Sequence, residues 1–135
     1  MSALARVHAI YAAFGSGNIP AILDRLSPDV DWEYGATPGN VVPWLQPRRG
    51  RDGAATFFSE LARSLRIQRF APKHFLADGD DLVVVVLDIE FVVLATGRRV
   101  VEEDEVHLWR FGADGLVCRF RHRADTALQA EACVT

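Results

Sequence analysis

The residues best suited to chemistry lie in one stretch, residues 102–122. Residues 102–111 read as a β-strand, and a turn at residues 112–115 leads into a second strand. Because side chains alternate along a strand, Glu105, His107 and Trp109 share one face of the first strand. A carboxylate, an imidazole and an indole beside apolar groups indicate the wall of a pocket. The other face is also mixed, which indicates a contact surface.

The turn predicts the register of these two strands. It places Glu105 opposite His122 and His107 opposite Phe120. A carboxylate beside an imidazole raises the pKa of the imidazole and fixes its tautomer. We therefore predict a Glu105–His122 pair, with His107 or His122 abstracting or returning a proton next to a carbonyl group. A structural pair at the rim of the sheet is the alternative.

Aromatic residues supply further candidate ligand contacts. Tyr34 and Tyr11 carry hydroxyl groups that can donate a hydrogen bond to a developing enolate, and Trp32 can orient a ligand. Trp44 lies in a proline- and glycine-rich loop, residues 35–50, where an exposed indole would waste apolar surface. It therefore either completes the core or covers a ligand as a lid.

Composition excludes several function classes. The chain has 135 residues, half of them hydrophobic, and a formal net charge of −3, so it lacks the basic surface of a nucleic-acid-binding protein. No apolar run is long enough to span a membrane, and the N-terminus lacks the pattern of a signal peptide. The two cysteines form no disulfide framework. We expect a cytoplasmic protein without membrane or nucleic-acid partners.

The sequence shows no motif for cofactor chemistry. No two histidines have helical metal-ligand spacing, and there is no phosphate-binding glycine loop, dinucleotide fingerprint or nucleophile elbow. We expect no metal and no cofactor. An enzyme of this sequence would be a cofactor-independent isomerase, cyclase or lyase.

Periodicity predicts the elements that position these residues. Three helices are expected: residues 2–14, a short helix capped by Asn18, and a helix capped by Asp52 that runs to about Arg66. Strands are expected near residues 30–34, 68–77 and 82–94. The prediction is one domain, residues 1–135. Its fold class is α+β, with three N-terminal helices packed on a strongly bent, mostly antiparallel sheet.

The outer face of this sheet is expected to combine an apolar centre with charged residues on neighbouring strands. Its members are Val84, Val86, Val106 and Leu108, with Asp88, Glu90, Asp104, Arg110, Arg119, Arg121 and Arg123 around them. An apolar centre with an arginine-containing rim is typical of a protein interface. We predict a homodimer through this face; a solvated face with ion pairs is the alternative.

Several motifs, taken in order, resemble one known family. They are DVDW at residues 29–32, RGRDG at 49–53 followed by Phe57 and Phe58, VHLWRF at 106–111, and RFR at 119–121 with Asp125. Together they resemble the SnoaL-like group of the nuclear-transport-factor-2-like superfamily, which also includes ketosteroid isomerases. The resemblance implies a cone-shaped roll with a deep apolar pocket, usually as a homodimer. It does not fix the function, because the family includes cyclases, isomerases, dehydratases, epoxide hydrolases and non-catalytic binders.

The resemblance also implies pocket-facing positions. Strand by strand they are Val30, Trp32 and Tyr34; Ile89, Phe91 and Val93; Glu103, Glu105, His107 and Trp109; and Cys118, Phe120, His122 and Ala124. Ketosteroid isomerases place a general-base Asp where this chain has Tyr34 and an oxyanion-stabilising acid where it has His107, so their mechanism does not transfer. SnoaL-type cyclases use an Asp near the end of the last strand, where Asp125 is the nearest candidate. Strict alternation points Asp125 away from the pocket, so a bulge would have to turn it inward.

These inferences predict binding of a small, largely apolar, carbonyl-containing molecule, polyketide- or steroid-like, in a deep pocket. The predicted chemistry is proton transfer in a cyclisation, isomerisation or dehydration. The catalytic candidates are His107, His122, Glu105 and Asp125, and the substrate-binding candidates are Tyr11, Trp32, Tyr34, Trp44, Phe91, Trp109 and Phe120. The alternative is a non-catalytic ligand-binding or protein-interaction module of the same fold.

Overall fold

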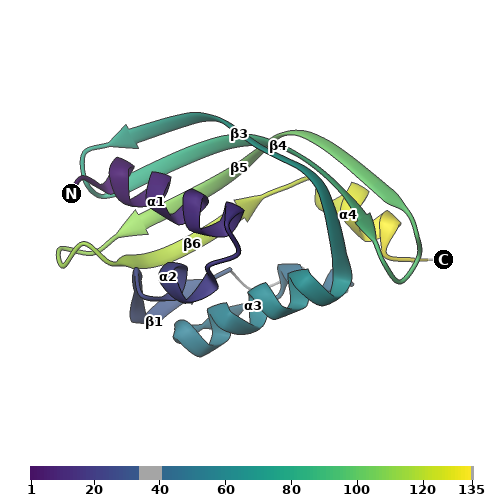
Figure 1. Ribbon diagram of the computed structural model, residues 1–135, viewed down its shortest axis with the longest axis horizontal. Helices are drawn as coiled ribbons and strands as arrows, with labels where there is room; N and C mark the ends of the chain where they lie inside the picture. The colour runs from purple at the N-terminus through teal and green to yellow at the C-terminus, as the bar shows by residue number, and fades with distance from the viewer. Residues whose placement is uncertain (34–40, 135) are drawn as a thin grey trace.

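The computed structural model describes residues 1–33 and 41–134, which form an α+β fold, as predicted. The helices are α1 (Ala3–Gly15), α2 (Ile19–Leu23), the 3-10 helix η1 (Pro43–Leu45), α3 (Gly50–Ser64) and α4 (Thr126–Ala132). The strands are β1 (Leu26–Trp32), β2 (Arg48–Arg49), β3 (Leu65–Asp78), β4 (Leu82–Val93), β5 (Arg99–Phe111) and β6 (Val117–Arg123). Figure 1 shows α1, α2 and α3 on one side of a bent sheet.

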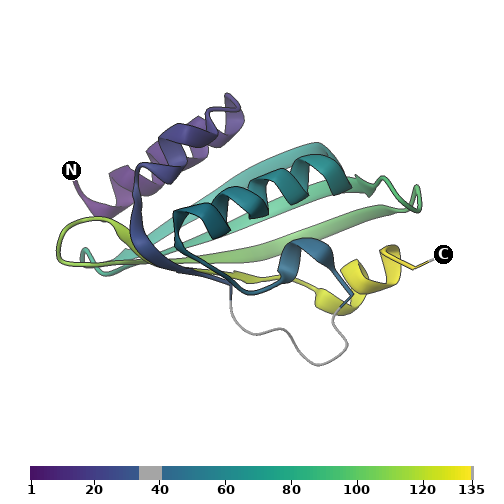
Figure 2. The same ribbon diagram turned by 90° about the horizontal axis from the view of Figure 1, so that it is seen from below.

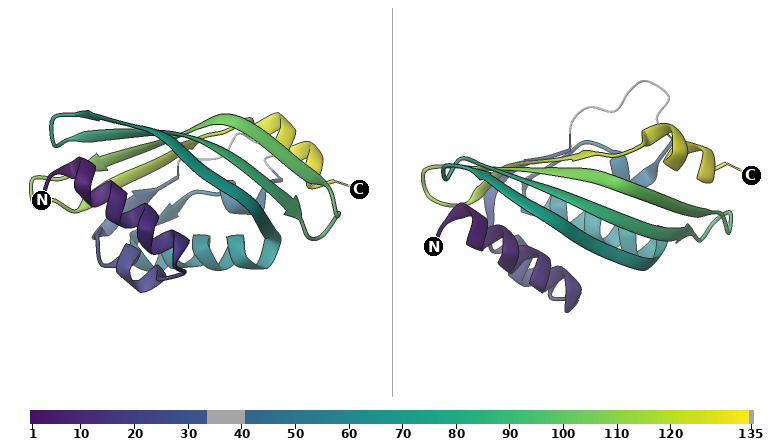
Figure 3. Two further views of the ribbon diagram at one scale, coloured as in Figure 1. Left: turned by 45° about the horizontal axis from the view of Figure 1, so that its top comes forward. Right: turned by 90° about the horizontal axis from the view of Figure 1, so that it is seen from above.

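The strands form a single sheet in the order β2-β1-β6-β5-β4-β3. All neighbours are antiparallel except β1 and β6, which run parallel. The long strands β3, β4 and β5 curve over the helices, as the two views of Figure 3 show. The core therefore lies between the concave face of the sheet and the three N-terminal helices.

Helix starts follow local capping chemistry. The side chain of Ser2 accepts a hydrogen bond from the backbone N–H of Ala5, and Asn18 caps α2 in the same way. The expectation that Asp52 caps α3 is wrong, because the helix begins two residues earlier, at Gly50. Asp52 lies instead in the first turn, where a negative charge is favourable near the helix N-terminus.

Helix α4 was not expected from the sequence. Asp125 caps it, since its carboxylate accepts a hydrogen bond from the backbone N–H of Leu128 at 3.0 Å. The helix lies beside η1, as Figure 2 shows. Its Gln129 side chain is buried, so α4 contributes a polar group to the interior.

The predicted hairpin register between β5 and β6 is wrong by two residues. His107 faces His122 and Trp109 faces Phe120. The register changes between the pairs Phe111–Val117 and Arg110–Arg119, where β6 contains one residue more than β5. A shift of two residues keeps the same side chains on the same face. Phe120 and His122 therefore still point inward, although Cys118 is exposed.

A second irregularity lies in β5. The register with β4 changes between Leu87 and Ile89, and Asp104 has a positive φ of 60°. This β-bulge places Glu102 inward and leaves Glu103 exposed, contrary to the strict alternation expected for Glu103. Beyond the bulge Glu105, His107 and Trp109 are buried on the inner face, as predicted.

Candidate acid–base site in an apolar cavity

A cavity of about 70 Å³, partly open to solvent, lies between the helices and the sheet. Since one water needs at least roughly 10–15 Å³, the cavity holds several waters or a small organic group. Its wall contains six of the predicted substrate-binding residues, namely Tyr11, Trp32, Trp44, Phe91, Trp109 and Phe120. Tyr34 lies outside the described residues. The polar lining comes from Tyr11, Glu105, His107, His122 and Gln129 together with the indole N–H groups.

His107 is held at both ring nitrogens. Its Nε2 lies 3.2 Å from the Glu105 carboxylate, and its Nδ1 lies 2.5 Å from the Tyr11 hydroxyl. Trp109 Nε1–H donates to the same hydroxyl oxygen at 3.1 Å. With Glu105 ionised, His107 carries its proton on Nε2, so Tyr11 O–H donates to Nδ1.

Burial and hydrogen bonding determine the charge states of these hydrogen-bonded side chains. Burial lowers the pKa of His107, although the hydrogen bond to Glu105 opposes the shift. Burial also raises the pKa of the Tyr11 hydroxyl, which keeps it protonated. For Glu105, burial favours the acid, but the hydrogen bond from His107 and the positive charge of His122 outweigh it and lower its pKa. The result is a neutral imidazole between a phenol and a carboxylate.

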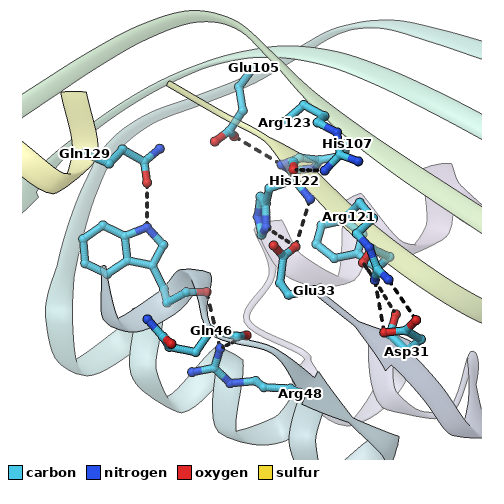
Figure 4. Close-up of polar contacts among 12 residues, drawn as sticks. Asp31, Glu33, Gln46, Arg48, Glu105, His107, Arg121, His122, Arg123 and Gln129 are labelled. Carbon is cyan, nitrogen blue, oxygen red and sulfur yellow. Dashed lines mark hydrogen bonds and ion pairs between the residues drawn. The ribbon is translucent and has the colours of Figure 1, made fainter. Parts of the chain in front are cut away.

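His122 has a different partner, Glu33. One carboxylate oxygen of Glu33 lies 2.6 Å from His122 Nδ1 and accepts the backbone N–H of His122 at 2.8 Å (Figure 4). Burial disfavours the charged imidazole, but the negative charge and hydrogen bond of Glu33 outweigh it and raise the pKa of His122. Glu33 therefore orients the imidazole ring of His122 through Nδ1. The described residues make no hydrogen bond to the Nε2 of this ring.

The predicted Glu105–His122 pair is therefore wrong. Because of the register shift, Glu105 bonds His107 on its own strand, and the acid that holds His122 is Glu33. Strand alternation in β1 placed Glu33 on the outer face. Its φ of +64° ends that alternation, and its side chain is buried. No sequence signal marks a non-glycine residue for this conformation.

A second set of hydrogen-bonded side chains lies at the end of the cavity next to α4. Trp44 Nε1–H donates to the Gln129 carbonyl at 2.8 Å, and the Gln129 amide donates to Glu102 at 3.1 Å. Burial, together with the nearby charge of Glu105, raises the pKa of Glu102. Trp44 is buried and its ring meets Phe91 edge-on, so it belongs to both the core and the cavity wall.

Asp125 does not reach the cavity. Its carboxylate is the N-cap of α4, and its side chain is exposed. Its backbone N–H donates to Glu102 at 3.1 Å, so Asp125 supports the hydrogen bonds of Glu102 through its backbone. The bulge that would have turned Asp125 inward does not occur, because the chain enters a helix at this point.

Trp32 carries the polar atom without a partner. Its side chain is 1% exposed, and its Nε1–H has no hydrogen-bond acceptor among the described residues. It lies in the cavity wall, stacked on Phe120 with ring centroids 4.3 Å apart. A buried donor without an acceptor costs roughly 1–3 kcal/mol, which a bound acceptor would offset.

The model of the SnoaL-like domain family matches residues 7–120. The chain belongs to the SnoaL-like family. This confirms the resemblance seen in the sequence and places the fold among the cone-shaped NTF2-like folds. Comparison with curated proteins finds no match.

Solved structures share this fold. An NTF2-like protein from Burkholderia pseudomallei K96243 is 27% identical, with a TM-score of 0.82 and all of both chains covered. TerC, crystallised with polyporic acid, is 28% identical, with a TM-score of 0.80 and 97% of each chain covered. An NTF2-like protein from Burkholderia thailandensis E264 is 23% identical with a TM-score of 0.85, covering 100% of this chain and 99% of its own.

Within residues 1–33 and 41–134, no group of three His, Cys, Asp or Glu side chains is placed to hold a metal ion. None of the helices in the described part of the chain has the length and apolar character needed to cross a bilayer.

Proposed function

We propose that the cavity binds a small, largely apolar molecule with a carbonyl group, and that His122 exchanges a proton with it. The reaction would be a cyclisation, an isomerisation or a dehydration next to that carbonyl. The observation that carries this proposal is the His122–Glu33 pair, whose imidazole lies in a largely apolar wall. Ionisable groups are costly to bury, so a buried pair beside a cavity is a candidate functional group.

The two edges of His122 support different roles. Glu33 holds the Nδ1 edge, which fixes the tautomer and orients the ring. The Nε2 edge is then available to a ligand. Protonated His122 donates to a developing oxyanion, and neutral His122 accepts a proton from the adjacent carbon.

Trp32 supports a carbonyl as the polar group of the ligand. Its buried N–H needs an acceptor, and a carbonyl oxygen provides one without adding a second charge. Phe57 contacts both Trp32 and His122, with ring centroids 5.4 Å from each, so the two polar groups lie around one aromatic ring. The rest of the ligand would contact apolar wall.

His107 would not contact the ligand itself but would position the Tyr11 hydroxyl. Both its nitrogens are occupied, so it orients the Tyr11 hydroxyl while Glu105 orients His107. This same observation favours a second candidate function, a non-catalytic binding module. In that case the His107 chain and the His122–Glu33 pair only shape the cavity.

The relative TerC supports a small-molecule ligand, because it was crystallised with polyporic acid. Small cyclic ketones suit a cavity of about 70 Å³ and are the first probes, and polyporic acid and steroids follow as larger ones. All three tryptophans lie in the cavity wall, so quenching of intrinsic fluorescence reports occupancy directly. Turnover of each ligand that binds is then followed by product analysis.

The test compares wild type with His122→Gln, and with His74→Gln as the control. His74 is exposed on β3, so the control makes the same chemical change away from the cavity. The proposal predicts a ligand that quenches the fluorescence and is turned over by wild type and His74→Gln but not by His122→Gln. Binding without turnover in all three proteins would establish the non-catalytic module instead. No binding by any compound of this panel would refute the proposed ligand class.

A further inference from the structure

Half-buried side chains mark where the cavity meets solvent. Most residues of the cavity wall are buried, and those that keep partial exposure line its opening. Apart from His122, the half-buried wall residues are aromatic or aliphatic and come from three elements: Tyr11 and Phe14 of α1, Phe58 and Leu61 of α3, and Ile67 and Phe70 of β3. Strand β3 starts at the end of α3 and runs back past α1, so these elements surround one opening (Figure 1).

The ring of Phe14 lies across this opening. Its centroid is 6.2 Å from that of Phe58 and 5.2 Å from that of Phe70, so it contacts both α3 and β3. Phe14 comes one residue before Gly15, where α1 ends. Helix ends open at a lower free-energy cost than helix centres do. The Phe14 ring can therefore shift more readily than Phe58, which lies within α3, or Phe70, which lies within β3.

Both neighbours of Phe14 lead to the polar groups of the cavity. Phe58 contacts Trp32, with ring centroids 5.6 Å apart, and Trp32 carries the N–H that has no acceptor among the described residues. Phe70 lies against His107, with ring centroids 6.4 Å apart. A ligand that enters beside Phe14 therefore meets apolar rings first and the polar groups behind them.

The size of the cavity limits which ligands fit while Phe14 stays in place. An apolar cavity of about 150 Å³ holds benzene, whereas this cavity has a volume of about 70 Å³. A small cyclic ketone fits into such a space, but a fused two-ring ketone needs a wall side chain to move. Phe14 is the wall residue best placed to do so.

We propose that ligands enter between α1, α3 and β3, and that the ring of Phe14 limits their size. This inference rests on the proposed binding of a ligand in the cavity. It makes Phe14 a specificity-determining residue, which acts through the space that its ring occupies. Its removal should admit ligands that the wild-type protein excludes.

The first arm of the test measures entry without a specific ligand. Acrylamide quenches tryptophan fluorescence on contact, and all three tryptophans are buried in the cavity wall. Phe14→Ala and the milder Phe14→Leu should both raise the quenching rate constant several-fold. Phe75→Ala is the control, because Phe75 is also half-buried against α1, where it stacks on His8, but does not line the cavity. It should be quenched as the wild type is.

The second arm measures ligand size by the rise in melting temperature that a bound ligand causes. The probes are cyclopentanone, 1-tetralone, and tetralin, which is the hydrocarbon with the two fused rings of 1-tetralone. Cyclopentanone should stabilise wild type and all variants. 1-Tetralone should bind Phe14→Ala about tenfold or more tightly than it binds wild type or Phe75→Ala.

Tetralin separates this inference from the proposed carbonyl ligand. Equal binding of tetralin and 1-tetralone, with both still favouring Phe14→Ala, would refute the carbonyl ligand class and support the size limit. Unchanged quenching in both Phe14 variants, or an equal rise in Phe75→Ala, would overturn the entrance. Equal binding of 1-tetralone by wild type and Phe14→Ala, or failure of both two-ring compounds to bind Phe14→Ala, would overturn the size limit.

Discussion

His107 and His122 show how neighbouring partners separate two identical side chains. Their rings lie 4.8 Å apart and are perpendicular, one on β5 and one on β6. Each has a carboxylate partner, yet the pKa of His107 is lowered and that of His122 is raised. Burial affects both, and the positive charge of His122 further disfavours a second proton on His107. One protonated and one neutral imidazole are therefore expected in the same wall.

Replacing Glu33 tests the cause of the raised pKa of His122. A pKa raised in the folded state gives stability that is full below the unfolded value of about 6.5 and is lost as the pH rises through the folded pKa. In Glu33→Gln, the free energy of unfolding should fall much less as the pH rises, because the amide keeps a hydrogen-bond acceptor but no charge. The difference should be on the order of 1 kcal/mol, measured by urea unfolding at a series of pH values.

The control for this experiment is Glu103→Gln. Glu103 is exposed on β5, so the variant removes one carboxylate without touching either histidine. It should keep the pH dependence of the wild type. A Glu33→Gln protein with that same dependence would show that another group holds the His122 proton.

The tryptophans offer a matched pair of substitutions. Trp109→Phe removes the N–H that donates to Tyr11, whereas Trp32→Phe removes an N–H without a partner among the described residues. Both lose similar ring volume, so Trp109→Phe should be the more destabilising by roughly 0.5–1.5 kcal/mol in urea unfolding. Equal losses of stability would mean that the Trp32 N–H is hydrogen-bonded in solution.

At the scale of elements, regular patterns predict the sheet and most of the cavity wall. Alternation correctly placed Trp32, Trp109 and Phe120 inward, because these positions lie in regular parts of their strands. It failed where the backbone departs from the pattern. The positive φ at Glu33 and the extra residue in the β5–β6 hairpin have no signature in residue type, and aspartate, as at Asp104, only favours a positive φ without requiring it. The site therefore gained Glu33 and Glu102 and lost Glu103.

Helix α4 could not be predicted from its amphipathic pattern, because it has seven residues and its buried side is centred on a glutamine. Gln129 links it to Trp44 and Glu102. Gln129→Leu should leave the buried Glu102 carboxylate and Trp44 N–H short of partners. The free energy of unfolding should fall by roughly 1–3 kcal/mol.

Gln68→Leu provides the comparison for this variant, since Gln68 is exposed on β3. It should change the free energy of unfolding little. If Gln129→Leu were as stable as Gln68→Leu, α4 would not be held by this network.

In the whole molecule, the two faces of the sheet carry different side chains. Strands β5 and β6 give aromatic and ionisable groups to the cavity and arginines to the outer face. We propose that the outer face also forms a homodimer around its half-buried apolar centre, which includes Val86 and Val106. Light scattering at micromolar concentration should then give the mass of two chains.

Val86→Lys should reduce that mass to one chain, because it places a charge in the centre of the proposed interface. Ala62→Lys, on the exposed side of α3, should leave it unchanged. A wild-type protein with the mass of one chain would contradict the homodimer.

An NMR pH titration of the imidazole rings of His107 and His122 in the wild-type protein would test the different charge states of the two histidines. His122 is expected to titrate above the ordinary value of about 6.5, and His107 to titrate below it or stay neutral throughout. That result would establish a charged and a neutral imidazole side by side in the cavity wall. Both rings titrating near 6.5, or in the reverse order, would contradict the assignment of Glu33 and His122 as the working pair.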